Sequence, residues 1–139
     1  MKPCRLINVL SGIAILFGVL TVYSGATALF GGAQAKAAAG NAVLFVVWFN
    51  FLGGFAYVLT ASGLMLKRQW GVWGAMLLAV LTALVSVAFA VHVFGGAPYE
   101  QRTVVAMGIR LGFWSLVAWA VWGYRPLLQQ PDGDMLLNK

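Results

Sequence analysis

The chain has 139 residues, of which 62% are hydrophobic and 9% charged, and its formal net charge is +6. A water-soluble core cannot use so much apolar surface, so the composition indicates an integral membrane protein. The basic residues stand at the ends of the apolar segments, where membrane proteins carry their anchors. The positive charge is therefore expected to serve topology in a lipid bilayer, and it does not indicate nucleic-acid binding.

Four apolar segments are each long enough to cross a bilayer, which takes about 20 helical residues. The first segment also exceeds the length of a signal-peptide core, so we expect it to be retained as a helix. We predict an all-α polytopic membrane protein, a single domain over 1–139 that forms a bundle of four transmembrane helices with short loops. A cytoplasmic tail at 125–139 is expected to be poorly ordered. The predicted spans are 7–30, 43–66, 71–94 and 103–124.

Lysine and arginine positions predict how the bundle is oriented. Lys36 and Arg102 are the only basic residues in the two loops on one side. The positive-inside rule therefore places both termini in the cytoplasm of a multi-pass plasma membrane protein, in the manner of a bacterial inner membrane. The tight turn at 67–70 predicts that the second and third spans are antiparallel neighbours. Six basic residues lie on the opposite, cytoplasmic side: Lys2, Arg5, Lys67, Arg68, Arg125 and Lys139.

Small residues recur on one face of each span. Lipid gives no hydrophobic drive for helix association, so we expect close packing through these faces. The stripe on the first span is Ser11, Ala14, Gly18, Thr21, Gly25 and Ala28, and that on the fourth is Gly108, Gly112, Ser115 and Ala118.

Arg110 does not follow the small stripe of its span. It shares a face with bulky residues such as Met107 and Trp114, and bulky faces usually contact lipid. A charge at this depth costs about 2.5–3.5 kcal/mol at mid-membrane on insertion scales unless it is solvated or paired. We expect Arg110 to be anchored by Glu100, by lipid head groups or by an acid of a partner, or else to extend toward the interface.

Polar residues concentrate in the outer half of the spans. We predict that Tyr23, Asn50, His92, Glu100 and Arg110 lie at similar depths and form a candidate binding site that opens to the outer leaflet. Asn50 is expected to have a side-chain partner, because an unsatisfied amide in lipid is costly.

The inventory of reactive residues is short. With one cysteine, one histidine and three acids, the chain offers no evident catalytic residues, metal site or cofactor site, which argues against an enzyme. The sequence favours a non-enzymatic subunit or accessory protein of a larger membrane complex, with a protein partner on the Arg110 face of the fourth span. One alternative is a small transporter or channel for an anion or lipid. Another is a haem or quinone redox protein, based on His92 and Met107.

Overall fold

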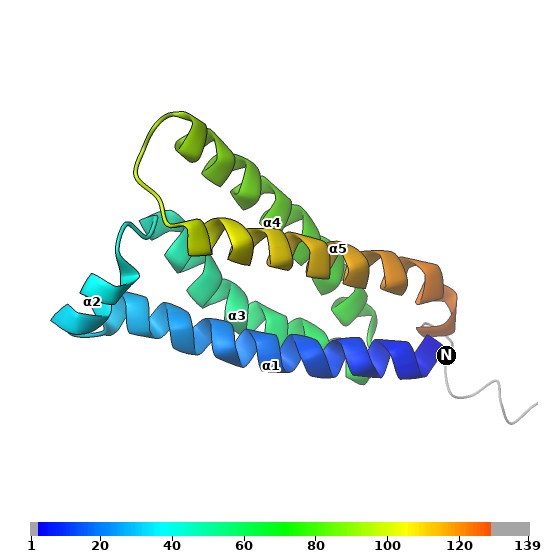
Figure 1. Ribbon diagram of the computed structural model, residues 1–139. Coiled ribbons are helices and arrows are strands. Elements are labelled where there is room, and N and C mark those ends of the chain that lie inside the picture. The colour runs from blue at the N-terminus through cyan, green and yellow to red at the C-terminus, as the bar shows by residue number, and fades with distance from the viewer. Residues whose placement is uncertain (1–2, 129–139) are drawn as a thin grey trace, which may run out of the picture.

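The computed structural model describes residues 3–128, and all of its regular elements are helices (Figure 1). Four of these helices are long and apolar enough to span a membrane, so the predicted all-α bundle of four spanning helices is confirmed. The architecture is that of a multi-pass membrane protein. The helices are α1 (Pro3–Phe30), α2 (Ala33–Ala39), α3 (Leu44–Met65), α4 (Gln69–Phe94) and α5 (Gln101–Leu128).

The helices differ from the predicted spans in several places, and the first, α1, begins at Pro3 rather than at residue 7. The short helix α2 occupies what was expected to be a loop, and its run of Ala, Gln and Lys consists of strong helix formers. Helix α5 begins at Gln101 rather than at residue 103. It also continues past residue 124 to Leu128, so the first part of the predicted tail is helical. The rest of that tail, 129–139, lies outside the described residues.

The tightest helix pair is α1 with α3. A Cβ placed on Gly18 would come within 2.8 Å of the backbone oxygen of Gly54, and the reverse distance is also 2.8 Å. A Cβ on Gly25 would come within 2.9 Å of the Cβ of Phe51. Two backbones can approach this closely only where side chains are absent, so the predicted packing of the α1 stripe is confirmed.

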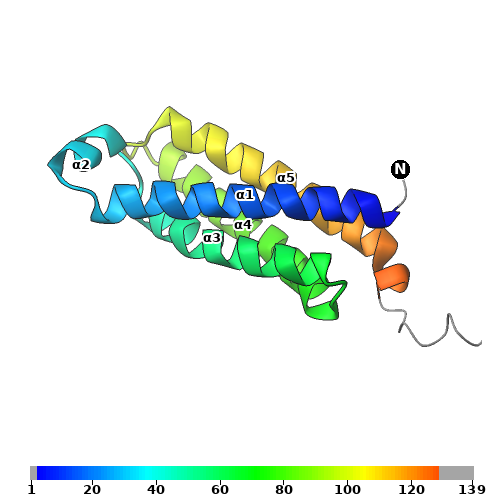
Figure 2. The same cartoon turned by 90° about the horizontal axis from the view of Figure 1, so that it is seen from below.

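The bundle has two differently packed ends, which we name by their elements. The α2 end carries α2 and the loop between α4 and α5, and the N-terminal end carries the start of α1. Neighbours around the bundle follow the order α1, α3, α4 and α5, but α1 contacts α3 far more extensively than it contacts α5. Figure 2 shows α5 crossing α1 and the two helices diverging from the crossing toward the α2 end.

The interior of the N-terminal half is apolar and continuous. All four long helices contribute fully buried side chains to one cluster, so this half is closed by packed hydrocarbon. A second, smaller apolar cluster lies between α3, α4 and α5 near the α2 end and consists of Val43, Val46, Phe89 and Met107.

The rotation of α5 about its axis is opposite to the prediction. Its small residues Gly108, Gly112 and Ser115 are exposed on the outside of the bundle. Its bulky face, including Met107 and Trp114, is buried inside. The reason is volume: α5 lies farther from α1 than α3 does, so large side chains are needed to fill the interior.

Candidate functional site

A cavity of about 240 Å³ lies between α1 and α5, in the half of the bundle where these helices diverge. Its walls carry hydroxyl and amide groups from three helices, and the α2-end side of the cavity, which we call the mouth, carries charged residues. The polar wall residues are Thr21 and Ser24 of α1, Asn50 of α3 and Thr103 of α5.

Arg110 lines the cavity deepest along α5, about 14 Å down the helix from its first residue. Only 8% of the residue is exposed. One Nη donates to the Thr21 hydroxyl at 3.5 Å, which is long for a hydrogen bond, and the guanidinium lies 5.4 Å from the centre of the Phe17 ring. The expectation that Arg110 faces lipid is therefore wrong, because the bulky face of α5 points inward.

Tyr57 lies beside Arg110, and two further fully buried side chains with polar atoms, Thr82 and Trp114, lie next to Tyr57. The Tyr57 and Trp114 rings lie 4.8 Å apart. The Tyr57 hydroxyl lies close to Arg110, Trp114 and Thr82. Among the described residues, however, the Tyr57 hydroxyl, the Thr82 hydroxyl, the Trp114 indole nitrogen and the Arg110 Nε have no hydrogen-bond partner. This buried group therefore retains unused hydrogen-bonding capacity next to the cavity.

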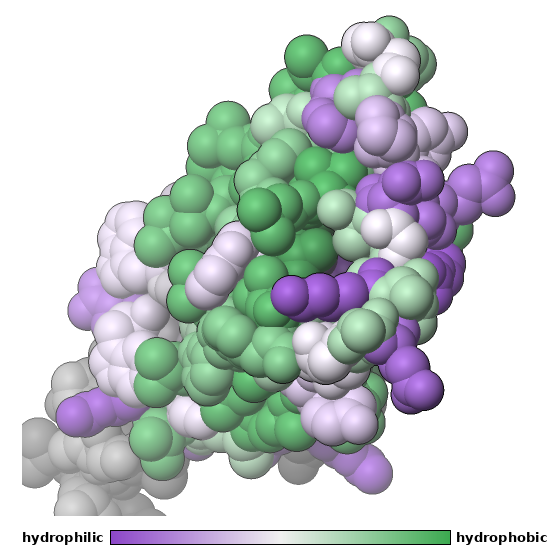
Figure 3. Space-filling model, turned by 90° about the vertical axis from the view of Figure 1, so that its left-hand side faces the viewer, coloured by the Kyte–Doolittle hydropathy of each residue, from purple (hydrophilic) through white to green (hydrophobic). Residues whose placement is uncertain are grey.

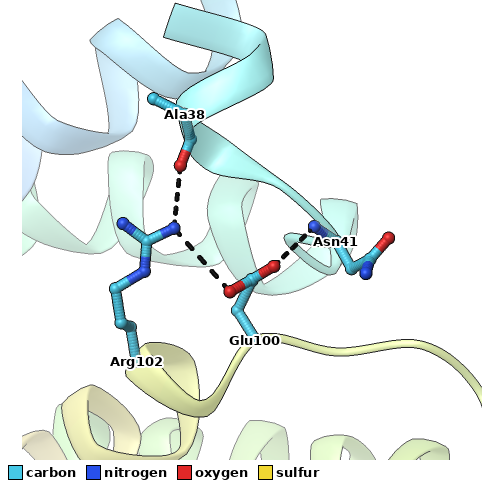
Figure 4. A network of polar contacts seen from close by, with 4 residues as sticks. All are labelled: Ala38, Asn41, Glu100 and Arg102. Atoms are coloured by element: carbon cyan, nitrogen blue, oxygen red, sulfur yellow. Dashed lines mark hydrogen bonds and ion pairs between the residues drawn. The ribbon is translucent and has the colours of Figure 1, made fainter.

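The mouth of the cavity is held by a small polar network, shown in Figure 4. The Glu100 carboxylate accepts a hydrogen bond of 2.9 Å from the backbone N–H of Asn41. Arg102 donates to the backbone oxygen of Ala38 at 2.7 Å and forms an ion pair with Glu100 at 3.7 Å. The partners of Glu100 are thus Arg102 and the loop after α2, so the expected pairing of Glu100 with Arg110 is wrong.

Asn50 lines the cavity, but not in the way the sequence suggested. Its side-chain oxygen is buried, and no partner for that oxygen lies among the described residues, so the expected side-chain partner is missing. An amide presents two donors on one side and an acceptor on the other, so a rotation of the group exchanges which of them faces the cavity.

Two of the five predicted site residues lie elsewhere. Tyr23 is 73% exposed on the outside of α1, because it is two residues, about 200°, from Thr21 around the helix. His92 lies on a separate surface groove with Phe45 and Trp48. One of its ring nitrogens lies 3.2 Å from the backbone oxygen of Pro98. The structure therefore brings together Asn50, Glu100 and Arg110 only.

Sequence reasoning did not assign Thr21 or Arg102 to the site. Thr21 was counted with the packing stripe of α1, although it is a polar residue at the depth of Arg110. Arg102 was expected in the loop above the site, with Glu100 as a possible counter-ion, but it was not named as a site residue, although it stands eight residues before Arg110 in the sequence. A polar position on a small stripe, opposite an intramembrane arginine, was the available signal for Thr21.

The charges around the cavity favour an anion. Its lining has two guanidinium groups and one carboxylate, and that carboxylate is already paired with Arg102 at the mouth. A guanidinium offers five N–H donors and no acceptor, and the surrounding hydroxyls can also donate. In Figure 3, which looks onto the α2 end, hydrophilic residues gather along the right-hand side and hydrophobic residues cover the left and upper parts.

Comparisons with protein-family models, with curated proteins and with solved structures find no match to this chain. Functional inference therefore depends on the cavity and on the residues that line it.

Proposed function

We propose that this protein binds an anionic group, a phosphate or a carboxylate, in the cavity between α1 and α5. The observation that carries the proposal is the burial of Arg110 with no carboxylate of the described residues 3–128 paired with it. The one ion pair among the described residues joins Arg102 and Glu100 at the mouth. The groups shown next to Arg110 are neutral: the Thr21 hydroxyl, the Phe17 ring and the Tyr57 hydroxyl.

The energetics of a buried charge support this proposal. An arginine cannot be deprotonated in proteins, so its charge must be solvated or paired. An uncompensated charge in the membrane interior is costly, and such residues mark binding sites or ion paths in membrane proteins. A ligand anion at Arg110 would form charge-assisted hydrogen bonds, which are about twice as strong as neutral ones.

The orientation of the cavity follows from the charge bias. Among the described residues, Arg5, Lys67, Arg68 and Arg125 belong to the N-terminal end of the bundle, and Lys36 and Arg102 belong to the α2 end. From this charge bias we propose that both termini are cytoplasmic and that the cavity opens toward the outer leaflet of the plasma membrane. A reporter enzyme fused after Lys139 should be active only in the cytoplasm. Activity on the outer side would contradict the proposed orientation.

The packed N-terminal half supports binding rather than free conduction. Between Arg110 and the N-terminal end, the bundle interior is filled by the large apolar cluster that all four long helices share. An ion path would have to open this cluster. The arrangement therefore fits a receptor, a lipid-binding accessory protein or a carrier in its outward-facing state better than it fits an open channel.

The other functions considered from the sequence receive less support. A partner on the Arg110 face of α5 is disfavoured, because that face lies inside the bundle. A role as a subunit of a larger complex stays a prediction. A redox role would use His92 and Met107, but His92 lies on the surface groove, whereas Met107 is buried in the smaller apolar cluster.

The experiment measures the binding of three probes to the protein purified in a neutral detergent. Dihexanoyl phosphatidylglycerol carries an anionic head group on two short chains, dihexanoyl phosphatidylcholine is a control without net charge, and glycerol phosphate is an anion without chains. Binding of the first probe alone would identify a lipid ligand. Binding of glycerol phosphate as well would identify a free anion.

Arg110→Leu should abolish anion binding, and Arg110→Lys should retain part of it, since lysine keeps the charge but loses the planar fork. Lys36→Gln is the matched control: Lys36 is an exposed basic residue of α2 outside the cavity lining, so its loss should leave binding unchanged. Equal binding by wild type and Arg110→Leu, with both variants folded in thermal unfolding, would contradict the proposal.

A further inference from the structure

Two arginines of α5 line the same cavity at different depths. Arg102 lies at the mouth and Arg110 lies inside, eight residues or about 12 Å apart along the helix. The side chain of Arg102 is 72% exposed, so a ligand entering from outside can reach it. The cavity thus has a cation at each end, and a ligand that spans its length meets both.

The Glu100 carboxylate occupies the mouth in the way that a bound anion would. It receives a backbone N–H from Asn41 and lies 3.7 Å from the Arg102 guanidinium. A backbone amide together with a guanidinium is a common donor set for a carboxylate or phosphate. The side chain of Glu100 is only 27% exposed.

The loop after α2 is shaped around this carboxylate. Gly40 has φ +60°, and a Cβ at Gly40 would collide with the Glu100 side chain. The absence of a side chain at this position is what leaves room for the carboxylate. The pocket that now holds Glu100 therefore consists of Gly40, the Asn41 amide and Arg102.

We propose that the mouth is a second anion subsite and that Glu100 occupies it as an internal substitute for part of the ligand. This inference rests on the proposed function, because it assumes that an anion binds at Arg110. The ligand class is a molecule with two anionic groups, one bound at Arg110 and the other displacing Glu100 from Arg102 and the Asn41 amide. Glu100 then weakens dianion binding by competing for the mouth.

The test compares octanedioate, which has a carboxylate at each end, with octanoate, which has the same chain length and one carboxylate. Glu100→Gln keeps an oxygen that accepts from the Asn41 amide but removes the competing charge. It should tighten octanedioate binding about three- to fivefold, the range expected for release of an exposed ion pair, and leave octanoate binding nearly unchanged. Arg102→Gln should remove the preference for octanedioate.

Gln34→Lys is the control for general electrostatics. Like Glu100→Gln, it raises the net charge by one at the α2 end, but Gln34 is exposed on α2 outside the cavity lining. The proposal is overturned if Gln34→Lys strengthens octanedioate binding as much as Glu100→Gln does, if Glu100→Gln affects both probes equally or neither, or if octanedioate binds neither protein. Octanoate binding that is lost in Arg110→Leu would still support the proposed function in each of those cases.

Discussion

Helix α1 has two neighbours in the membrane and meets them in opposite ways. Against α3, its small residues allow backbone contact at Gly18 and Gly54. Against α5, small residues of the same helix, Thr21 and Ala28 among them, border a cavity. The difference shows that a small-residue stripe does not specify tight packing by itself, because the outcome depends on what the facing helix presents.

The facing helices differ in their own side chains. Helix α3 presents Gly54 to α1, and two small surfaces meet without a gap. Helix α5 turns its glycines outward and directs Arg110 toward α1, so a long side chain keeps the two helices apart. One interface is thus stabilised by close contact, and the other leaves room for a ligand.

Gly18→Leu should have the largest effect on stability, because it places a large side chain in the close contact between α1 and α3. Its Cβ would lie 2.8 Å from the Gly54 backbone oxygen and 2.9 Å from a methyl of Val58, so the helices must separate. We expect a loss of about 3 kcal/mol in the free energy of unfolding in detergent. Gly12→Leu on the same helix is the control, since a Cβ at Gly12 meets nothing within 4 Å. Similar losses of unfolding free energy in both variants would show that the face of α1 at Gly18 is not packed more closely than the face at Gly12.

Two substitutions at Tyr57 should distinguish the contribution of its ring to stability from that of its hydroxyl. Tyr57→Leu removes the stacking with Phe17 and the tilted ring contact with Trp114, and it should destabilise the protein by about 2–3 kcal/mol. Tyr57→Phe keeps the ring and removes a buried hydroxyl that has no partner among the described residues. It should stabilise the protein by about 1 kcal/mol. A clear loss of stability in Tyr57→Phe would mean that the hydroxyl is satisfied in the folded protein. Thermal or denaturant unfolding measures both changes.

Gly40→Ala should destabilise the protein less than Gly18→Leu or Tyr57→Leu does, and it tests the contact between Gly40 and Glu100 at the mouth. The variant adds a Cβ at φ +60° and pushes it into Glu100, so we expect a loss of about 1–2 kcal/mol. Gly96→Ala is the matched control, because Gly96 has φ +78° and open space around it. The difference between the two variants reports the Glu100 contact alone. No difference in thermal unfolding would mean that Glu100 moves aside without cost.

The four spanning helices could be predicted because such helices are recognised in a sequence by their length and apolar composition. The α1 stripe was also predictable, since its alternating spacing marks one face and α3 carries a matching glycine. The rotation of α5 was not, because its two opposite faces, one small and one bulky, both fit a helix interface. Lipid and protein interiors are similarly apolar, so composition alone does not choose between them.

For the candidate site, the sequence could predict only how deep its residues lie along the bundle axis. The sequence placed Asn50, Glu100 and Arg110 in the same half of the bundle, and the structure brings them to one cavity. It could not exclude Tyr23, whose position around the helix axis matters as much as its depth. The partners of Glu100 depend on the conformation of the loop after α2. A loop has no sequence periodicity, so these contacts could not be predicted.

The interior position of Arg110 has a consequence for how the chain is assembled in the membrane. Helix α5 is synthesised after α1 and α3, the helices that carry Phe17, Thr21 and Tyr57. An arginine inserted alone at this depth would face hydrocarbon, whereas one that enters beside α1 and α3 finds a hydroxyl and aromatic rings already in place. The order of the helices along the chain therefore lets the most costly residue enter the bilayer after its surroundings have been built.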